Sequence, residues 1–172
     1  MTLSNAKIPI IGFTAASGTG KTTLLTQLIP LLKQRGLRVG LIKHSHHDFE
    51  IDYSNKDSFR LRQAGASPVL LVSPYRRVII TETPEHQEPV LNKQLTFLNQ
   101  SELDLILVEG FKHETFIKIE LHRPALNHAL LYPNDRHIIA VASDEPIDLP
   151  DYLTLLDLNQ VAQIADFMLT LL

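Results

Sequence analysis

Residues 15–22 of this 172-residue chain read Ala-Ala-Ser-Gly-Thr-Gly-Lys-Thr, and these eight residues are the strongest indication of the fold. It follows the pattern G-x-x-x-x-G-K-[ST] of phosphate-binding loops (P-loops), with Ala15 in the position of the first glycine. Gly18 and Gly20 allow the backbone to turn so that its N–H groups point at phosphate oxygens. Such a loop requires a buried strand before it and a helix after it, and the flanking sequence predicts both.

The flanking segments alternate between strand and helix patterns. Residues 8–14 form an apolar run typical of a strand that is buried on both faces. Residues 22–35 place leucines at helical spacing and stop at Gly36, although we expect Pro30 to kink the last turn. Residues 37–44 return to a strand pattern. A strand, a helix and a second strand in this order predict a parallel sheet.

The alternation continues to the end of the chain, with one excursion. We expect further strands at 103–109, 116–122, 137–142 and 153–156, and helices at 55–65, 89–100 and 159–172. The runs 68–73 and 78–83 predict a strand pair with a tight turn. Residues 116–122 alternate between polar and apolar types, which predicts a half-exposed strand that offers an open sheet edge to a second chain. The sequence therefore predicts one α/β domain over residues 1–172, with a mostly parallel central sheet flanked by helices and a small β-rich excursion.

Composition excludes several classes of protein. The net charge of −3, from 16 basic and 19 acidic side chains, provides no general field for nucleic acid. The absence of cysteine excludes disulfides, thiolate metal sites and a cysteine nucleophile. No run approaches the ~20 apolar residues that a membrane-spanning helix needs. Lys7 and the short run after it imitate a signal peptide poorly, so we expect a soluble, cytoplasmic protein.

Two further features complete the predicted nucleotide site. Lys21 is expected to reach the β- and γ-phosphates, and the Thr22 hydroxyl to ligate Mg²⁺. The apolar run 105–108 ends in Glu109, an acid at the carboxyl end of a strand, where ligands of parallel sheets lie. We expect Glu109 to be the second acid, which holds Mg²⁺ or its water.

The polar stretch 43–48, Lys-His-Ser-His-His-Asp, admits more than one interpretation. Its imidazole and carboxylate groups could form a zinc site, but their spacing does not suit a single structural zinc. Because the stretch leaves a strand near the P-loop, Asp48 or Asp52 could instead contact Mg²⁺ through water, and Lys43 or a histidine could contact phosphate. A solvated loop is the third alternative.

Five stretches together resemble the molybdopterin-guanine dinucleotide biosynthesis adaptor protein B (MobB) family. They are AASGTGKTTLL at 15–25, LIKHSHHDFEID at 41–52, KDSFRLRQAGA at 56–66, LDLILVEGFKHE at 103–114 and RHIIAVASD at 136–144. The P-loop alone is generic, whereas VEGFKHE and IKHSHHD are far more specific.

The resemblance implies a P-loop protein of the signal-recognition-particle/MinD-like class that binds GTP with Mg²⁺, hydrolyses it weakly and forms a homodimer. It also implies a partner, the guanylyltransferase that joins molybdopterin to GMP, and contact with molybdopterin-carrying proteins. The family's nucleotide-binding residues fall on Ser17, Gly18, Thr19, Gly20, Lys21, Thr22 and Thr23. Glu109 takes the place of the second acid, and Asp48 falls in the histidine-aspartate motif as a second catalytic residue.

Base recognition is the weakest part of the prediction, because the usual guanine-reading N-K-x-D is absent. Asp144, just after the strand expected at 137–142, is the best substitute, since a carboxylate can accept hydrogen bonds from guanine N1–H and N2–H₂.

Two other functions remain open at this point. His44, His46 and His47 would suit a metallochaperone GTPase, but the missing cysteines count against it. A small-molecule kinase uses the same loop and an arginine-rich lid, for which Arg76, Arg77, Arg123 and Arg136 are too scattered.

Overall fold

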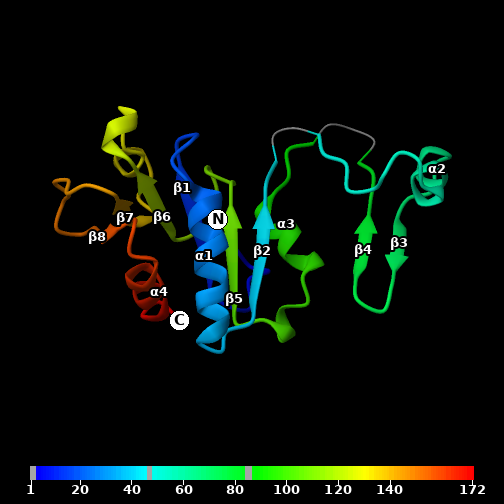
Figure 1. Cartoon of the computed structure of the whole chain (residues 1–172), viewed down its shortest axis with the longest axis horizontal. Helices are drawn as coiled ribbons and strands as arrows, with labels where there is room; N and C mark the ends of the chain where they lie inside the picture. Colours follow the sequence, from blue (N-terminus) through cyan, green and yellow to red (C-terminus); the bar gives the residue numbers. More distant parts are fainter. Residues whose placement is uncertain (1–2, 46–47, 84–86) are drawn as a thin grey trace. The chain divides into compact units, whose positions relative to one another are not determined.

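The computed structural model describes residues 3–45, 48–83 and 87–172. These residues form two compact units, a larger one of residues 1–44 and 89–172 and a smaller one of residues 45–88 (Figure 1).

A six-stranded, wholly parallel sheet forms the centre of the larger unit, in the order β2-β5-β1-β6-β7-β8. The strands are β1 (Ile10–Ala15), β2 (Val39–Lys43), β5 (Leu105–Glu109), β6 (Lys118–His122), β7 (Ile138–Ser143) and β8 (Thr154–Asp157). The helices are α1 (Lys21–Gln34), α3 (Leu91–Gln94) and α4 (Val161–Leu169), with 3₁₀ turns at Leu95–Phe97, Gln100–Glu102, Pro124–Leu126 and Tyr132–Asn134. The predicted α/β class with a parallel central sheet is confirmed.

Both faces of the sheet are covered, as the apolar strands require. On one face, Ile11 and Phe13 of β1 belong to a core that also contains the buried leucines of α1 and the buried side chains of α4 (Figure 1). On the other face, Ile10 packs in a cluster with Leu91 and Leu95 from α3 and the turn after it. The helix expected at 89–100 is thus broken, because its α-helical part ends at Gln94.

Helix α1 connects the P-loop to the rest of the sheet. It continues through Pro30 to Gln34 and then stops. Gly36 adopts a φ of 88°, a conformation that glycine reaches at little cost, and the Leu37 N–H donates to the Leu32 carbonyl at 3.2 Å. The helix therefore ends in a Schellman-type cap that directs the chain into β2.

The expectation for residues 116–122 is wrong. Strand β6 lies inside the sheet between β1 and β7, and the sheet edges are β2 and β8. Lys118 and Glu120, which gave the polar half of the alternation, are only 1% and 2% exposed. Their charged groups have partners inside the protein: Lys118 binds Asp135, and Glu120 accepts hydrogen bonds from the N–H groups of Leu131 and Tyr132. A polar alternation therefore came from buried, paired charges rather than from solvent exposure.

The smaller unit consists of α2 (Asp57–Gln63) and an antiparallel pair of strands, β3 (Val69–Val72) and β4 (Arg77–Ile80). This confirms the predicted strand pair. The Arg62 side chain, 7% exposed, forms ion pairs of 2.5 Å with Glu50 and with Glu82. These two carboxylates neutralise Arg62, so its charge is used in holding this unit together.

Candidate nucleotide-binding site

The P-loop leaves the carboxyl end of β1 and turns into α1. Gly18 and Gly20 adopt φ values of 78° and 102°, which favour glycine. The buried Thr19 side chain donates from Oγ1 to the Ala16 carbonyl at 2.9 Å, which closes the turn between the glycines and the strand. The turn that was expected at Gly18 and Gly20 is therefore present, and phosphate binding by its N–H groups stays a prediction.

The N-terminus of α1 is open to an anionic ligand. Gly20 precedes the helix, and no side chain caps it. The first N–H groups of a helix lack intrahelical partners, and the helix dipole is positive at this end. Ser17 and Gly18 are exposed before the helix, and Thr22 and Thr23 are exposed in its first turn. These features are suited to bind phosphate.

Lys21, the first residue of α1, lies among other charges. Its Nζ is 3.5 Å from the Ala15 carbonyl oxygen. The pKa of Lys21 is lowered, chiefly because its side chain is partly buried. The carboxylate of Glu109 acts in the opposite direction, whereas the nearby cations Lys112 and Lys43 lower the pKa further. A bound polyphosphate would remove this like-charge repulsion, because it places negative charge among the three amines.

Glu109 ends β5, in register with Phe13 of β1 and Lys43 of β2. Its carboxylate is 14% exposed and lies 3.2 Å from the Lys43 Nζ. The structure thus brings Glu109, Lys43 and Lys21 together at the carboxyl ends of the parallel strands, where ligands bind in this kind of fold. Whether Glu109 and Thr22 hold Mg²⁺ together stays a prediction.

The sharp turn after Glu109 explains part of the sequence pattern. Gly110 has a φ of 96°, and a Cβ at this position would lie 2.7 Å from the His44 Cβ. Phe111 follows with a φ of 52°, and its ring centroid lies 4.9 Å from that of His44. The segments that contain His44 and Gly110 therefore meet, and only glycine fits the point of closest approach.

Arg123 directly follows β6 and is a residue of this site, although the sequence offered it only as one of four arginines too scattered to form a lid. Its Nε donates to the Thr19 carbonyl at 3.0 Å, and its NH1 lies 2.5 Å from Asp144 Oδ2. The other carboxylate oxygen of Asp144 is buried and has no hydrogen-bond partner among the described residues. Arg123 therefore connects the P-loop backbone to the residue predicted to read the base.

A small cavity of about 150 Å³ lies beside the beginning of α1. It is lined by Gly20, Thr23, Leu24, Gln27, Arg123, Leu158, Asn159 and Val161. These residues come from the P-loop, α1 and the segments that follow β6 and β8. The cavity is therefore next to the phosphate site, at the carboxyl ends of the strands.

Residues 10–144 match the protein family described as "Molybdopterin guanine dinucleotide synthesis protein B", MobB. The chain belongs to the MobB family. The two stretches most specific to the family pattern, at 42–44 and 109–111, are those that contact each other through His44, Gly110 and Phe111.

Relatives and solved structures of the MobB family cover almost the whole chain. The molybdopterin-guanine dinucleotide biosynthesis adapter protein of Escherichia coli is 50% identical over 165 residues, 94% of this chain and 91% of that protein. The Haemophilus influenzae protein of the same name is 46% identical over 166 residues, 95% and 89% of the two chains. A crystal structure of a molybdopterin-guanine biosynthesis protein B has a TM-score of 0.72 at 28% identity, covering 95% of this chain and 99% of that one.

The histidine-aspartate stretch of this MobB chain is only partly described. His46 and His47 lie outside the described residues. Asp48 belongs to the smaller unit, where its Oδ1 accepts the N–H of Phe49 at 2.9 Å, and its catalytic role stays a prediction. Within 3–45, 48–83 and 87–172, no three histidine, aspartate or glutamate side chains gather as a metal site. No helix in these ranges has the length and apolar character to cross a membrane.

Proposed function

We propose that this chain is a GTP-binding adaptor in molybdenum cofactor biosynthesis. It assists the guanylyltransferase that attaches GMP to molybdopterin, which forms molybdopterin guanine dinucleotide. Two observations support the proposal: the adapter proteins of E. coli and H. influenzae match almost the whole chain, and the P-loop has an uncapped helix N-terminus with Lys21 and Glu109 beside it. The second observation carries the nucleotide part of the proposal.

Mg²⁺ fits the donor groups of this site. The Thr22 hydroxyl and the Glu109 carboxylate supply the hard oxygen ligands that Mg²⁺ prefers. When bound, the ion neutralises charge on the phosphate oxygens. Lys21 and the N–H groups of the loop bind the phosphates, and Glu109 positions water for a weak hydrolysis. The catalytic function of Asp48 is proposed from its place in the family's histidine-aspartate motif alone. Asp144, which binds Arg123 and follows β7, accepts hydrogen bonds from guanine.

A kinase function is the less favoured alternative. A tetraacyldisaccharide 4'-kinase of Actinobacillus pleuropneumoniae is 30% identical over 115 residues, but this segment is only 33% of that enzyme. The adapter proteins match about nine tenths of both chains, so the adaptor function accounts for the whole molecule. We further propose that the protein is cytoplasmic, acts as a homodimer, and contacts the guanylyltransferase and molybdopterin-carrying proteins.

Titration with GTP, ATP and their analogues, with and without Mg²⁺, tests the nucleotide function. We expect Mg²⁺-dependent binding that favours GTP. Lys21→Ala should abolish measurable GTP binding without loss of the fold, because it removes charge-assisted contacts from a partly exposed loop. Lys33→Ala, at the opposite end of α1, is the matched control and should bind normally. Equal affinity of the two folded variants would refute the site.

A further inference from the structure

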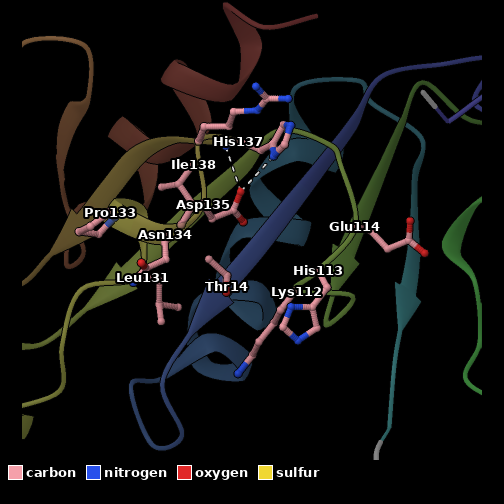
Figure 2. A pocket seen from close by; sticks show the side chains of 11 residues that line it. Thr14, Lys112, His113, Glu114, Leu131, Pro133, Asn134, Asp135, His137 and Ile138 are labelled. Carbon is pink, nitrogen blue, oxygen red and sulfur yellow. Dashed lines mark hydrogen bonds and ion pairs between the residues drawn. The ribbon is translucent and has the colours of Figure 1, made fainter. Parts of the chain in front are cut away.

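A second cavity, of about 590 Å³, lies in the larger unit, and Figure 2 shows the side chains that line it. Its floor includes Thr14, and its walls are residues 112–114, after β5, and residues 131–138, before and at the start of β7. Phe13 and Ala15 belong to the core under α1, so Thr14, between them on β1, faces the opposite side of the sheet. The volume lies in the range of small-molecule sites, ~300–1,000 Å³.

The buried side chain of Lys118 connects the two walls of the cavity. Its Nζ donates to the carbonyl oxygens of Lys112 and Glu114 at 3.1 and 2.7 Å, and to Asp135 Oδ2 at 2.7 Å. The carboxylate of Glu120 fixes the wall formed by residues 131–138, because it accepts hydrogen bonds from the N–H groups of Leu131 and Tyr132. The two walls of the cavity are therefore held in place by buried charged groups that have hydrogen-bond partners inside the protein.

The polar lining carries an excess of positive charge. Two acids line the cavity: the Asp135 carboxylate is neutralised by Lys118, whereas Glu114 Oε1 accepts only a neutral N–H, that of Leu91 at 3.0 Å. Lys112 and Arg136 are exposed cations on opposite walls. His113 and His137 add two imidazoles.

The His137 ring is oriented for a ligand. Asp135 Oδ1 lies 3.0 Å from the backbone N of His137 and 3.1 Å from its Nδ1 (Figure 2). This double contact fixes the ring by its Nδ1 side and leaves Nε2 for other partners.

Thr14 adds a hydroxyl group to the floor of this cavity. The residue is only 4% exposed, and it lines the cavity. A threonine hydroxyl can donate a hydrogen bond to a phosphate oxygen. Leu131, Pro133 and Ile138 add an apolar patch to the same cavity.

We propose that this cavity is a second ligand site, which binds a small organic phosphomonoester. The phosphate is bound by Lys112 and Arg136 with the help of His113, His137 and the Thr14 hydroxyl, and the organic part packs against Leu131, Pro133 and Ile138. Arginine and lysine are the usual cations for phosphate, and each contact is charge-assisted. The site goes beyond the proposed GTP function, because none of these side chains belongs to the P-loop, and of them only Lys112 affects the pKa of Lys21.

Phenyl phosphate, with phenol as the uncharged control, is a suitable probe. We would saturate the protein with GTP and Mg²⁺, so that the P-loop is occupied, and follow the imidazole NMR resonances of His113 and His137 during titration. We expect saturable shifts with phenyl phosphate and none with phenol. The same titration of the Lys21→Ala variant should give the same shifts, which separates this proposal from the nucleotide function. If neither imidazole moves with phenyl phosphate, the proposal is wrong.

Two variants test which residues bind the phosphate. Arg136→Glu should weaken the binding of phenyl phosphate about tenfold or more, because it removes a charge-assisted hydrogen bond and adds a negative charge. Lys33→Glu changes the net charge by the same amount but lies far from the cavity, so it should leave the affinity for phenyl phosphate unchanged. Equal weakening by both variants would show a general charge effect and overturn the site.

Thr14→Val keeps the shape of the floor and removes only the hydroxyl. We expect affinity for phenyl phosphate to fall about fivefold, for the loss of one neutral hydrogen bond, while GTP affinity and thermal stability are unchanged or improved. Unchanged phenyl phosphate affinity in this variant would contradict the contact with Thr14.

Discussion

The Nε–H of Arg123 lies 3.0 Å from the carbonyl oxygen of Thr19, so a side chain at the end of β6 holds the backbone of the P-loop. The same guanidinium binds Asp144, after β7. The phosphate loop and the segment beyond β7 are therefore joined through one residue. A change at Arg123 is expected to affect both phosphate binding and base selectivity.

Replacement of Arg123 by methionine should weaken GTP binding about tenfold, because it removes a hydrogen bond that fixes the Thr19 carbonyl and frees the Asp144 carboxylate. A fluorescent GTP analogue measures the affinity. Arg77→Met, in the smaller unit, removes an exposed arginine of equal size and serves as the control. If the two folded variants bind alike, Arg123 does not position the loop for its ligand.

Asp144→Asn tests base recognition. A carboxylate that accepts from guanine N1–H should discriminate strongly against adenine, which presents an acceptor at that position. The asparagine variant should therefore lose GTP preference without an equal loss of phosphate affinity. Competition of GTP and ATP with a labelled nucleotide gives both values. Equal falls in the two affinities, or no change in either, would remove Asp144 from the base site.

The sequence predicted Glu109 but not Arg123, although both follow a parallel strand. Glu109 follows a purely apolar run, which is typical of a central strand, so its position at the carboxyl end of the parallel sheet could be inferred. Arg123 follows β6, whose alternation predicted an exposed edge. The pairing of Lys118 with Asp135, 17 positions apart, carries no signal in local periodicity. Strand order, which brings β6 next to β1, was the missing information.

The carboxyl group of Asp104 provides a test of stability against pH. Hydrogen bonds from the Arg38 side chain and backbone N–H lower the pKa of Asp104 to about 2, from 3.8. A depressed pKa stabilises the folded state above the unfolded pKa, and this contribution disappears as the pH falls through the folded value.

Asp104→Asn should therefore lower the free energy of unfolding at neutral pH, and the difference from the unsubstituted protein should shrink between about pH 4 and pH 2. Urea denaturation at a series of pH values measures this difference. Asp151→Asn, at an exposed turn, is the control and should give no such trend. A difference that does not depend on pH would contradict the role of the Arg38 pair.

The proposed homodimer requires a different surface from the one that the sequence suggested. Ile119 is 0% exposed in the middle of the sheet, so a charge there would unfold the protein rather than separate two chains. The β3–β4 pair instead exposes Leu70, Val72 and Ile79 on one face. A two-stranded pair is only marginally stable alone, and its apolar face suits a second copy of this chain.

We expect Ile79→Lys to convert the dimer to a folded monomer, because the interface would have to bury an unpaired ammonium group. Phe97→Lys, an equally exposed apolar position in the larger unit, is the matched control and should stay dimeric. Light scattering after size-exclusion chromatography gives the mass of each variant, and circular dichroism reports whether it is folded. If Ile79→Lys remains a folded dimer, the β3–β4 face does not form the interface.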